Sequence, residues 1–360
     1  MKSQISNIKR LFDSNALWLS MLIGALGYKW LLPLKPTLPF WIFFMLFFTF
    51  CKVNPLDLRL HKWHWVVLIL QLVFAIAVYC GLMAFTGNEV LAQGLLMCFI
   101  MPTATAAPII AGKMGGSIQN LTTFTLLSNF ATAIIVPSLF PLINPAADMT
   151  FWPAFLLILS RIAPLLLGPF FAAWLLRLGF NKYYRIKSDK IGQHQINSDK
   201  IINHQSSIIN AKTFELPKSL AVVPFYLWVC SIIVLSAVVT NDVVTNYQSQ
   251  ISNMIILIIG SFLACLLQFG LGKLIGYYLP APSKGRDYQD VLINPAAAPK
   301  TMAGVSSITA GQAFGQKNTS LGVWMAQTYL HPLAALGAAA YIIWQNLFNS
   351  VQLFLAAHKK

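Results

Sequence analysis

Runs of about 20 predominantly apolar residues recur along most of this 360-residue chain, and each is long enough to cross a bilayer as a helix. Only 10% of the residues are charged, whereas soluble globular domains carry about 25%. Because a bilayer offers the backbone no hydrogen-bonding partners, runs of this length are expected to be helical. The sequence therefore predicts an all-α polytopic membrane protein, and it argues against a water-soluble enzyme and a disordered chain.

Hydropathy predicts ten spans, with two polar segments outside them. Residues 1–15 are polar and predict a cytosolic leader. Residues 180–216 contain a near-duplication, KSDKIGQHQ at 187–195 and NSDKIINHQ at 197–205, which is typical of an inserted loop. We assign this loop to the cytosol and give it no chemistry. The ten spans are placed at residues 16–34, 37–51, 65–86, 90–112, 119–143, 151–176, 219–240, 253–279, 301–329 and 332–355.

The positive charges predict the orientation of these spans. If the N-terminus is cytoplasmic, nearly all of the 25 Lys and Arg residues fall in cytoplasmic segments. Only Lys29 and Lys35 fall on the outer side, and Arg161 and Lys317 fall within spans. Cytoplasmic loops are enriched in Lys and Arg, so we expect both termini on the cytoplasmic side. The formal net charge of +15 is then an orientation signal, and no nucleic-acid partner is expected.

Few side chains in the predicted spans can bind a metal ion or carry a proton. The five cysteines form no CxxC motif and no Cys/His cluster, so we interpret them as small hydrophobic residues. They are Cys51, Cys80, Cys98, Cys230 and Cys265. All ten acidic residues fall in predicted loops or termini, so no carboxylate is expected within the membrane. They are Asp13, Asp57, Glu89, Asp148, Asp189, Asp199, Glu215, Asp242, Asp287 and Asp290.

Two prolines interrupt the fourth predicted span. Its end reads MPTATAAPIIAGKMGG (101–116), in which Pro102 and Pro108 flank Thr103 and Thr105. Proline removes a backbone donor and clashes with the preceding turn, so it frees backbone groups at membrane depth. A kinked helix is the alternative, but two prolines six residues apart with hydroxyl side chains between them favour a break.

The ninth predicted span contains a polar stretch, AGQAFGQKNTS at 310–320. A lysine within the membrane costs about 2.5–3.5 kcal/mol on insertion scales and is therefore a functional candidate. A loop in water is the alternative, but the LGVWMAQTYL that follows is too short to span a bilayer alone. The candidate residues of this stretch are Gln312, Gly315, Gln316, Lys317 and Asn318.

The two interruptions occupy corresponding positions if the chain consists of two five-span halves. Interrupted spans at matching positions indicate a transporter built from inverted repeats, with its site near the midplane. The sequence therefore predicts ten transmembrane helices as two inverted five-helix repeats in which helices 4 and 9 are broken. The segment NPAAAPK at 294–300 precedes the ninth span, and it is either re-entrant or a loop.

Three segments resemble the bile acid:sodium symporter family and its bacterial relatives. They are AGQAFGQKNTSLGVWMAQTYLHPLAALGAAAYIIWQN (310–346), the Pro-rich break at 102–108 and SIQNLTTFTLLSNFATAIIVPSLF (117–140). The resemblance implies a protein of the bacterial inner (plasma) membrane in which the broken helices 4 and 9 cross. It also implies a panel domain of helices 1, 2, 6 and 7 beside a core transport domain of helices 3–5 and 8–10. These domains correspond to residues 16–64 with 151–240 and to residues 65–143 with 253–355.

The resemblance further implies alternating-access transport of an organic anion such as a bile salt, a keto acid or pantoate. In the family, sodium ligands surround the ninth-helix break in a pattern like E-x-G-x-Q-N. Here Ala313 takes the Glu position and Lys317 takes the Gln position, while Asn318 is retained. Further polar candidates are Gln71, Thr125 and Ser128, which fit family ligands, and Asn129, which is either a ligand or an interhelical contact.

We hypothesise that the Lys317 ammonium takes the place of a sodium ion and is held by Gln71, Gln316 and nearby carbonyls. Transport is then sodium-independent, either facilitated or coupled to protonation of Lys317. Direct attraction of an anionic substrate is the alternative role for Lys317. Arg161, in the sixth span, is a candidate contact for the substrate carboxylate.

Two other functions stay open. One is conventional sodium-coupled symport of a bile acid-like anion, and the other is a membrane receptor or sensor that binds a ligand without moving it. An enzyme is not expected, because the predicted spans hold no acidic pair, no HExxH motif and no Ser/His/Asp arrangement. The expected partners are an organic anion and the lipid bilayer, with a homodimer left open. No cofactor is expected, and Na⁺ stays open only as the coupling ion of the symport alternative.

Overall fold

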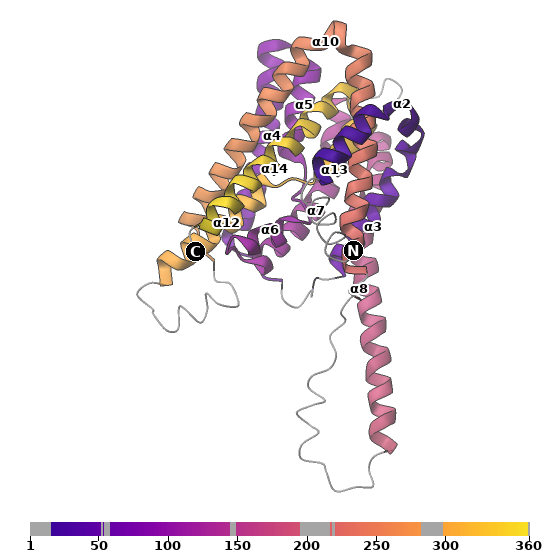
Figure 1. Cartoon of the computed structure of the whole chain (residues 1–360), viewed down its shortest axis with the longest axis vertical. Helices are drawn as coiled ribbons and strands as arrows, with labels where there is room; N and C mark the ends of the chain where they lie inside the picture. The colour runs from indigo at the N-terminus through magenta and orange to yellow at the C-terminus, as the bar shows by residue number, and fades with distance from the viewer. Residues whose placement is uncertain are drawn as a thin grey trace, which may run out of the picture.

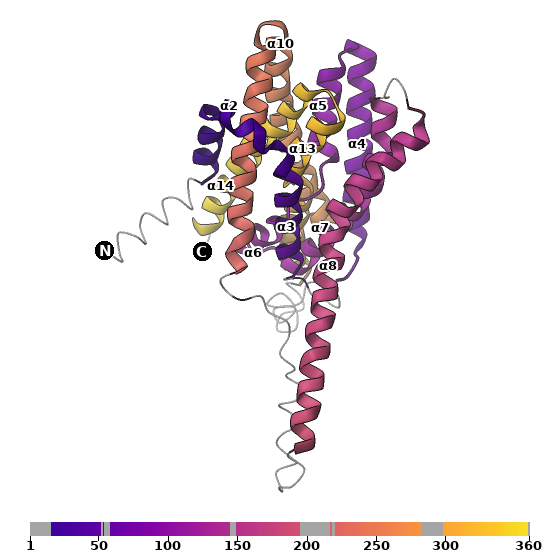
Figure 2. The ribbon, with the colours of Figure 1, turned by 90° about the vertical axis from the view of Figure 1, so that its right-hand side faces the viewer.

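The computed structural model describes residues 16–51, 53, 58–144, 149–194, 217, 220–281 and 298–358. These residues form helices and no strand, which confirms the predicted all-α class (Figures 1 and 2). The predicted leader at 1–15, the second half of the predicted insert at 195–216 and residues 294–297 of the Pro-rich segment lie outside the described residues.

The region of the first two predicted spans is interrupted by a short 3-10 helix. A helix over Ala16–Leu26 is followed by α2 (Tyr28–Leu31), the 3-10 helix η1 (Leu32–Thr37) and α3 (Leu38–Phe50). The prediction of one helix over 16–34 is therefore wrong. Pro33 and Pro36 lie in η1, and because proline has no backbone N–H they do not support a continuous α-helix there.

A tight turn joins α4 (Lys62–Thr86) to α5 (Glu89–Ile100). Gly87 ends α4 with a φ of 63°, a left-handed conformation that glycine adopts without a Cβ clash. The Asn88 side chain then begins α5 by accepting a hydrogen bond from the Leu91 N–H at 3.2 Å. These two residues turn the chain back, so α4 and α5 pack against each other.

The predicted interruption of the fourth span is confirmed. After α5 ends, the chain is non-helical until α6 (Ala107–Lys113), which is followed by α7 (Ile118–Ile143). We call residues 101–106 the first break. Pro108 lies in the first turn of α6, where a missing backbone N–H leaves no hydrogen bond unmade. Pro108 therefore starts the second half-helix, whereas Pro102 lies in the first break itself.

The long helix α8 (Phe151–His194) corrects the prediction for the insert. Residues 180–194 were expected to belong to a loop, but they continue the helix of the sixth span. In Figure 2 this extension projects from one end of the helical body. Hydropathy did not predict it, because a polar, charged stretch carries no apolar periodicity, although residues 180–194 contain no proline that would stop a helix already begun.

Two predicted spans belong to a single helical element, α10 (Val223–Tyr278), which follows the 3-10 turn η3 (Leu220–Val222). It consists of two apolar spans, Val223–Asn246 and Gln248–Tyr278, and turns back between them at the end opposite to the α8 extension (Figures 1 and 2). The expected loop between these spans is thus helical. Asp242 consequently lies within a candidate span, which corrects the prediction that every acidic residue falls in a loop.

The predicted interruption of the ninth span is also confirmed. Helix α12 (Ala298–Gly315) is separated from α13 (Thr319–Tyr329) by residues 316–318, which we call the second break. The chain then passes through the 3-10 turn η4 (Pro332–Ala334) into α14 (Ala335–His358). The second break is shorter than the polar stretch that predicted it, because Gln312 and Gly315 still belong to α12.

Length and composition identify a membrane-embedded protein. Six helices of the described chain are long and apolar enough to cross a bilayer. They are Tyr28–Phe50, Lys62–Thr86, Ile118–Ile143, Phe151–Phe180, Val223–Asn246 and Gln248–Tyr278. Large apolar side chains on them, such as Phe85 and Ile69, are exposed. A surface of this kind is stable against lipid tails and unstable in water.

Small residues let α10 approach α12 closely. A Cβ added at Gly276 would overlap the Ser306 carbonyl oxygen, and one added at Gly272 would lie 2.5 Å from the Ala310 carbonyl oxygen. Helices in membranes associate mainly through such close packing, since lipid tails are as apolar as the helices themselves. The α10–α12 contact therefore fixes the position of the half-helix that leads into the second break.

We expect Gly276→Ala to lower the stability of the detergent-solubilised protein by about 1–3 kcal/mol, because the methyl group forces two backbones apart. Gly270→Ala is the matched control in the same helix, since a Cβ there meets no atom within 4 Å. The control is expected to be neutral or stabilising by about 1 kcal/mol or less, because alanine is the better helix former. Thermal unfolding of both variants measures the difference, and equal melting temperatures would contradict the close contact.

Candidate functional site: the crossing of two broken helices

The two breaks cross and pair through their backbones. Thr103 and Lys317 form an isolated antiparallel bridge. The Asn318 N–H donates to the Pro102 carbonyl at 2.7 Å, and the Ala104 N–H donates to the Gln316 carbonyl at 2.9 Å. Backbone groups freed at membrane depth need protein partners, and each break supplies them to the other.

The side chains of Thr103 and Lys317 repeat this exchange. The Thr103 hydroxyl donates to the Ala313 carbonyl at 2.6 Å, and the Lys317 ammonium donates to the Phe99 carbonyl at 3.1 Å. The two acceptors occupy equivalent positions. Ala313 lies four residues before Lys317 in one segment, and Phe99 lies four residues before Thr103 in the other. Each bridging side chain thus reaches a carbonyl in the last turn of the opposite half-helix.

The backbone N–H groups of the same two residues are capped in an equivalent way. The Thr103 N–H donates to the Ser128 hydroxyl of α7 at 3.1 Å. The Lys317 N–H donates to the Gln345 side-chain oxygen of α14 at 2.9 Å. Helices α7 and α14 each follow a broken helix in the chain. The hydrogen bonds of the crossing therefore keep their pattern when the two breaks are exchanged, which defines a local two-fold arrangement.

The carbonyls at the end of α5 are capped by side chains from two other helices and from the second break. The Gln268 amide donates to the Cys98 carbonyl at 3.1 Å, and Lys317 donates to the next carbonyl, that of Phe99. The Gln71 amide donates to the Ile100 and Met101 carbonyls at 3.2 and 3.0 Å. The carboxyl end of a helix carries a partial negative charge, so an ammonium there is electrostatically favourable.

Lys317 is completely buried, with 0% of its surface exposed. Its Nζ also lies 5.2 Å from the centre of the Phe314 ring, within range of a cation–π interaction. No acidic side chain among the described residues contacts it. The predicted partners Gln71 and Gln316 are wrong, because Gln71 donates to carbonyls of α5 and the Gln316 oxygen accepts from Asn349 at 3.2 Å. The prediction of a carbonyl partner is confirmed.

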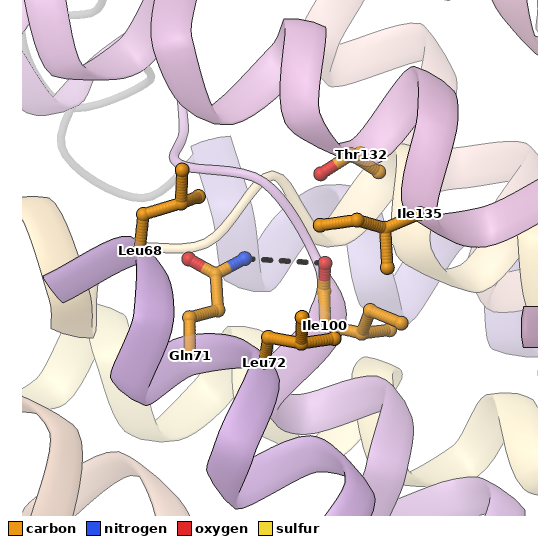
Figure 3. Close-up of a pocket in the computed structure, with 6 residues that line it drawn as sticks. All are labelled: Leu68, Gln71, Leu72, Ile100, Thr132 and Ile135. Carbon is orange, nitrogen blue, oxygen red and sulfur yellow. Dashed lines mark hydrogen bonds between the residues drawn. The ribbon is translucent and has the colours of Figure 1, made fainter. Parts of the chain in front are cut away.

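A small cavity lies beside Gln71, between α4, α5 and α7. Its volume of about 10 Å³ gives room for one water molecule or a particle of that size. The Gln71 Nε2 points to the Ile100 carbonyl, as Figure 3 shows, while its Oε1 has no partner in the described structure. The cavity is otherwise mostly apolar, and it is lined by Leu68, Gln71, Leu72, Ile100, Thr132 and Ile135.

The other predicted residues of the second break serve to connect helices. Gln312 donates to the Asn349 side-chain oxygen at 3.0 Å, and Asn349 in turn donates to Gln316. The Asn318 side chain caps α13 by accepting from the Leu321 N–H. Gly315 cannot carry a side chain without displacement, because an added Cβ would overlap the Phe269 ring.

The predicted polar residues of α7 divide into two groups. Ser128 contacts the first break, as described above. Thr125 and Asn129 bond within their own helix: the Thr125 hydroxyl donates to the Leu121 carbonyl at 2.9 Å, and the Asn129 amide donates to the Thr125 carbonyl at 2.7 Å. The Asn129 oxygen has no partner in the described structure. Of the two alternatives for Asn129, the interhelical contact is therefore absent among the described residues, and the role as a ligand is not tested.

Two predicted residues lie apart from this network. Thr105, in the first break, is partly buried and makes none of the contacts above. Arg161 of α8 is exposed, although it lies within a span, and the Tyr329 hydroxyl at the end of α13 has no hydrogen-bond partner in the described structure. A guanidinium surrounded by lipid tails is costly, which keeps Arg161 a functional candidate.

Four residues that hydrogen-bond at the crossing were not predicted as site residues: Gln268, Tyr341, Gln345 and Asn349. The Tyr341 hydroxyl donates to the Gly315 carbonyl at 2.8 Å and accepts from Gln268. A signal for three of them was present, since Tyr341, Gln345 and Asn349 recur every four residues and so share one face of α14. Gln268 stands alone in an apolar helix and carried no such signal.

Comparison with models of known protein families gave no match, and comparison with curated proteins gave none either. Among the described residues, no group of three His, Cys, Asp or Glu side chains lies close enough together to hold a metal ion. The site is therefore defined by its amides, hydroxyls, carbonyls and one ammonium.

Removing either backbone cap should destabilise the crossing. We expect Ser128→Ala to cost about 1–3 kcal/mol, because it leaves the buried Thr103 N–H without an acceptor, and Gln345→Met to cost a similar amount at the Lys317 N–H. Ser261→Ala is the matched control: Ser261 is also fully buried, but its hydroxyl donates to Ile258 within its own helix. Thermal unfolding measures the stability of each variant. If Ser261→Ala lowers the stability as much as Ser128→Ala does, the Ser128 cap on the Thr103 N–H contributes nothing beyond an ordinary buried serine.

Proposed function

We propose that this protein is a secondary transporter that moves a small or amphipathic organic anion across the membrane by alternating access. The observation that carries the proposal is the crossing of two broken helices through reciprocal hydrogen bonds. Discontinuous helices in membrane proteins gather at substrate and ion sites, because their free ends present charges and dipoles at membrane depth. A purely structural protein gains nothing from interrupting two spans at the same point.

The local two-fold arrangement at Thr103 and Lys317 supports two inverted five-helix repeats. The residues that cap it come from equivalent positions, Ser128 in the fifth span and Gln345 in the tenth. In such a fold the helices that carry the crossing form the core domain. The panel domain consists of the helix over Ala16–Leu26 with α2, of α3, of α8 and of the first span of α10. Substrate crosses the membrane when one domain moves against the other. The excess of Lys and Arg in the loops on one side supports cytoplasmic termini in the bacterial inner membrane.

Transport is proposed to be independent of sodium, with Lys317 as a built-in cation. The residues at the crossing do not fit a sodium ion, because the ammonium already occupies the Phe99 carbonyl and no carboxylate among the described residues contacts it. Sodium binds hard oxygen ligands, and an ammonium within the same ligand shell repels it. Conventional sodium symport and a non-transporting receptor are the alternatives, and the experiments below separate them.

The complete burial of Lys317 also favours the surrogate role over direct contact with substrate. A buried ammonium that already donates to Phe99 has to leave that carbonyl before it meets an anion. Arg161 is exposed and so remains the better candidate for substrate contact. The two cations then have different tasks: Lys317 balances the helix end, and Arg161 faces the anion.

We expect thermal stabilisation by an anionic substrate to be the same in Na⁺ and in K⁺ for the unaltered protein. Bile salts, keto acids and pantoate are the anions to screen, and a bound ligand at a hundred times its dissociation constant stabilises by about 2.7 kcal/mol. For Lys317→Gln we expect stabilisation to require Na⁺, since the ion then replaces the missing charge. The control Lys113→Gln removes an exposed lysine of α6 and should leave the cation response unchanged.

Uptake into proteoliposomes under the same ionic conditions then distinguishes the alternatives. Stabilisation of the unaltered protein only in Na⁺ would support conventional symport. Stabilisation without any uptake would support a receptor. Loss of binding in Lys317→Gln with no response to Na⁺ would instead assign Lys317 to substrate contact.

Arg161→Gln should raise the anion concentration for half-maximal uptake by about tenfold or more, because a hydrogen bond to a charged group contributes about 1.5–3 kcal/mol. Arg161→Lys should recover part of this affinity by keeping the charge. Arg177→Gln is the control in the same helix, since the Arg177 guanidinium donates to the Cys51 carbonyl at 3.1 Å. An unchanged half-maximal concentration for Arg161→Gln, measured with radiolabelled anion, would remove Arg161 from the site.

A further inference from the structure

Gln327, near the end of α13, joins a cation and an anion from two other elements. The Lys35 ammonium of η1 donates to its Oε1 at 3.0 Å, and its Nε2 donates to the Asp242 carboxylate of α10. The same Nε2 also donates to the Pro332 carbonyl of η4 at 3.0 Å. We call the three side chains Lys35, Gln327 and Asp242 the terminal bridge.

The terminal bridge connects the two groups of helices that alternating access requires to separate. Lys35 belongs to the link between the first two spans, and Asp242 to the first span of α10, both in the proposed panel domain. Gln327 belongs to α13, the second half of a broken helix of the proposed core domain. An amide is suited to this position because it can accept from a cation and donate to a carboxylate at once.

The bridge lies close to the end of the molecule at which α10 turns back. Asp242 is five residues before Tyr247, the residue that separates the two spans of α10. The distribution of Lys and Arg makes this the outer end. Three residues after Lys35, Leu38 is only 1% exposed at the start of α3, and α3 contacts α13. The bridge thus lies beside a tightly packed contact between the two groups of helices.

We propose that the terminal bridge is a latch that holds the outer side of the transporter closed, and that it has to open before the substrate can reach the crossing from outside. This proposal rests on the proposed transport function. Two features make the contact suitable for repeated opening. Its side chains are only partly buried, and both charges can return to water when it breaks.

The accessibility of position 38 in a Leu38→Cys variant measures opening of the latch, and the measurement needs no substrate. The reporter variant carries Leu38→Cys together with Cys80→Ala and Cys230→Ala, which remove the two exposed native thiols of the described chain. A membrane-impermeant maleimide added from outside measures how often Leu38→Cys becomes accessible. We expect slow labelling in this background, and acceleration by about tenfold when Gln327→Ala or Lys35→Met is added, because each removes a charge-assisted hydrogen bond.

Asn144→Ala is the matched control. The Asn144 amide donates to the Tyr329 carbonyl at 2.9 Å and so ties α13 to α7 at the same end, but within the proposed core domain. It should leave the labelling rate unchanged. Labelling that is unaffected by Gln327→Ala and Lys35→Met, or accelerated equally by Asn144→Ala, would overturn the latch.

This outcome is independent of the transport test. Accelerated labelling in a protein that takes up no anion would leave the bridge as a conformational latch and refute transport. If the protein takes up anion but neither Gln327→Ala nor Lys35→Met changes the labelling rate of Leu38→Cys, the latch is refuted and the transport function is not.

Discussion

The pairing of backbone groups within the membrane is the constraint on which the rest of this structure depends. Pro102 follows the end of α5 and interrupts the span, so the carbonyls in the last turn of α5 need partners at membrane depth. They are satisfied by side chains of α4, α10 and the second break, and the backbones of the two breaks pair with each other. The crossing is therefore a single cooperative unit, in which each helix end depends on residues far away in the sequence.

The sequence predicted where the helices break but not what holds the breaks. Proline and a cluster of polar residues act locally, so Pro102 and the stretch around Lys317 identified both interruptions. The partners depend on which helices meet, and a single sequence carries little of that information. Lys317 was assigned to Gln71, Gln316 and nearby carbonyls, and of these only a carbonyl, that of Phe99 in α5, contacts its ammonium. Gln345, which caps the Lys317 N–H, was not considered at all.

Lys317 departs from the local two-fold arrangement of the crossing by its charge. Its counterpart Thr103 makes the equivalent side-chain contact with a short neutral hydroxyl. The charge is therefore not needed to complete the hydrogen-bond pattern. An ammonium that brings a desolvation cost of about 2.5–3.5 kcal/mol without a structural need has to be retained for another reason. In the proposed sodium-independent mechanism, the Lys317 ammonium balances the partial negative charge at the carboxyl end of α5 in place of a mobile cation, which accounts for the position and the burial of Lys317.

Helix α13 connects the crossing to the outer end of the molecule. Asn318 caps its first turn at the second break, and Gln327 lies near its last turn in the terminal bridge. At 1.5 Å per residue, this 11-residue helix spans about 16 Å. Eight consecutive residues of α13, from Thr319 to Ala326, are buried, so the helix is packed over most of its length. In the proposed transport cycle, a displacement of α13 that separates Gln327 from Lys35 and Asp242 therefore also acts on the second break.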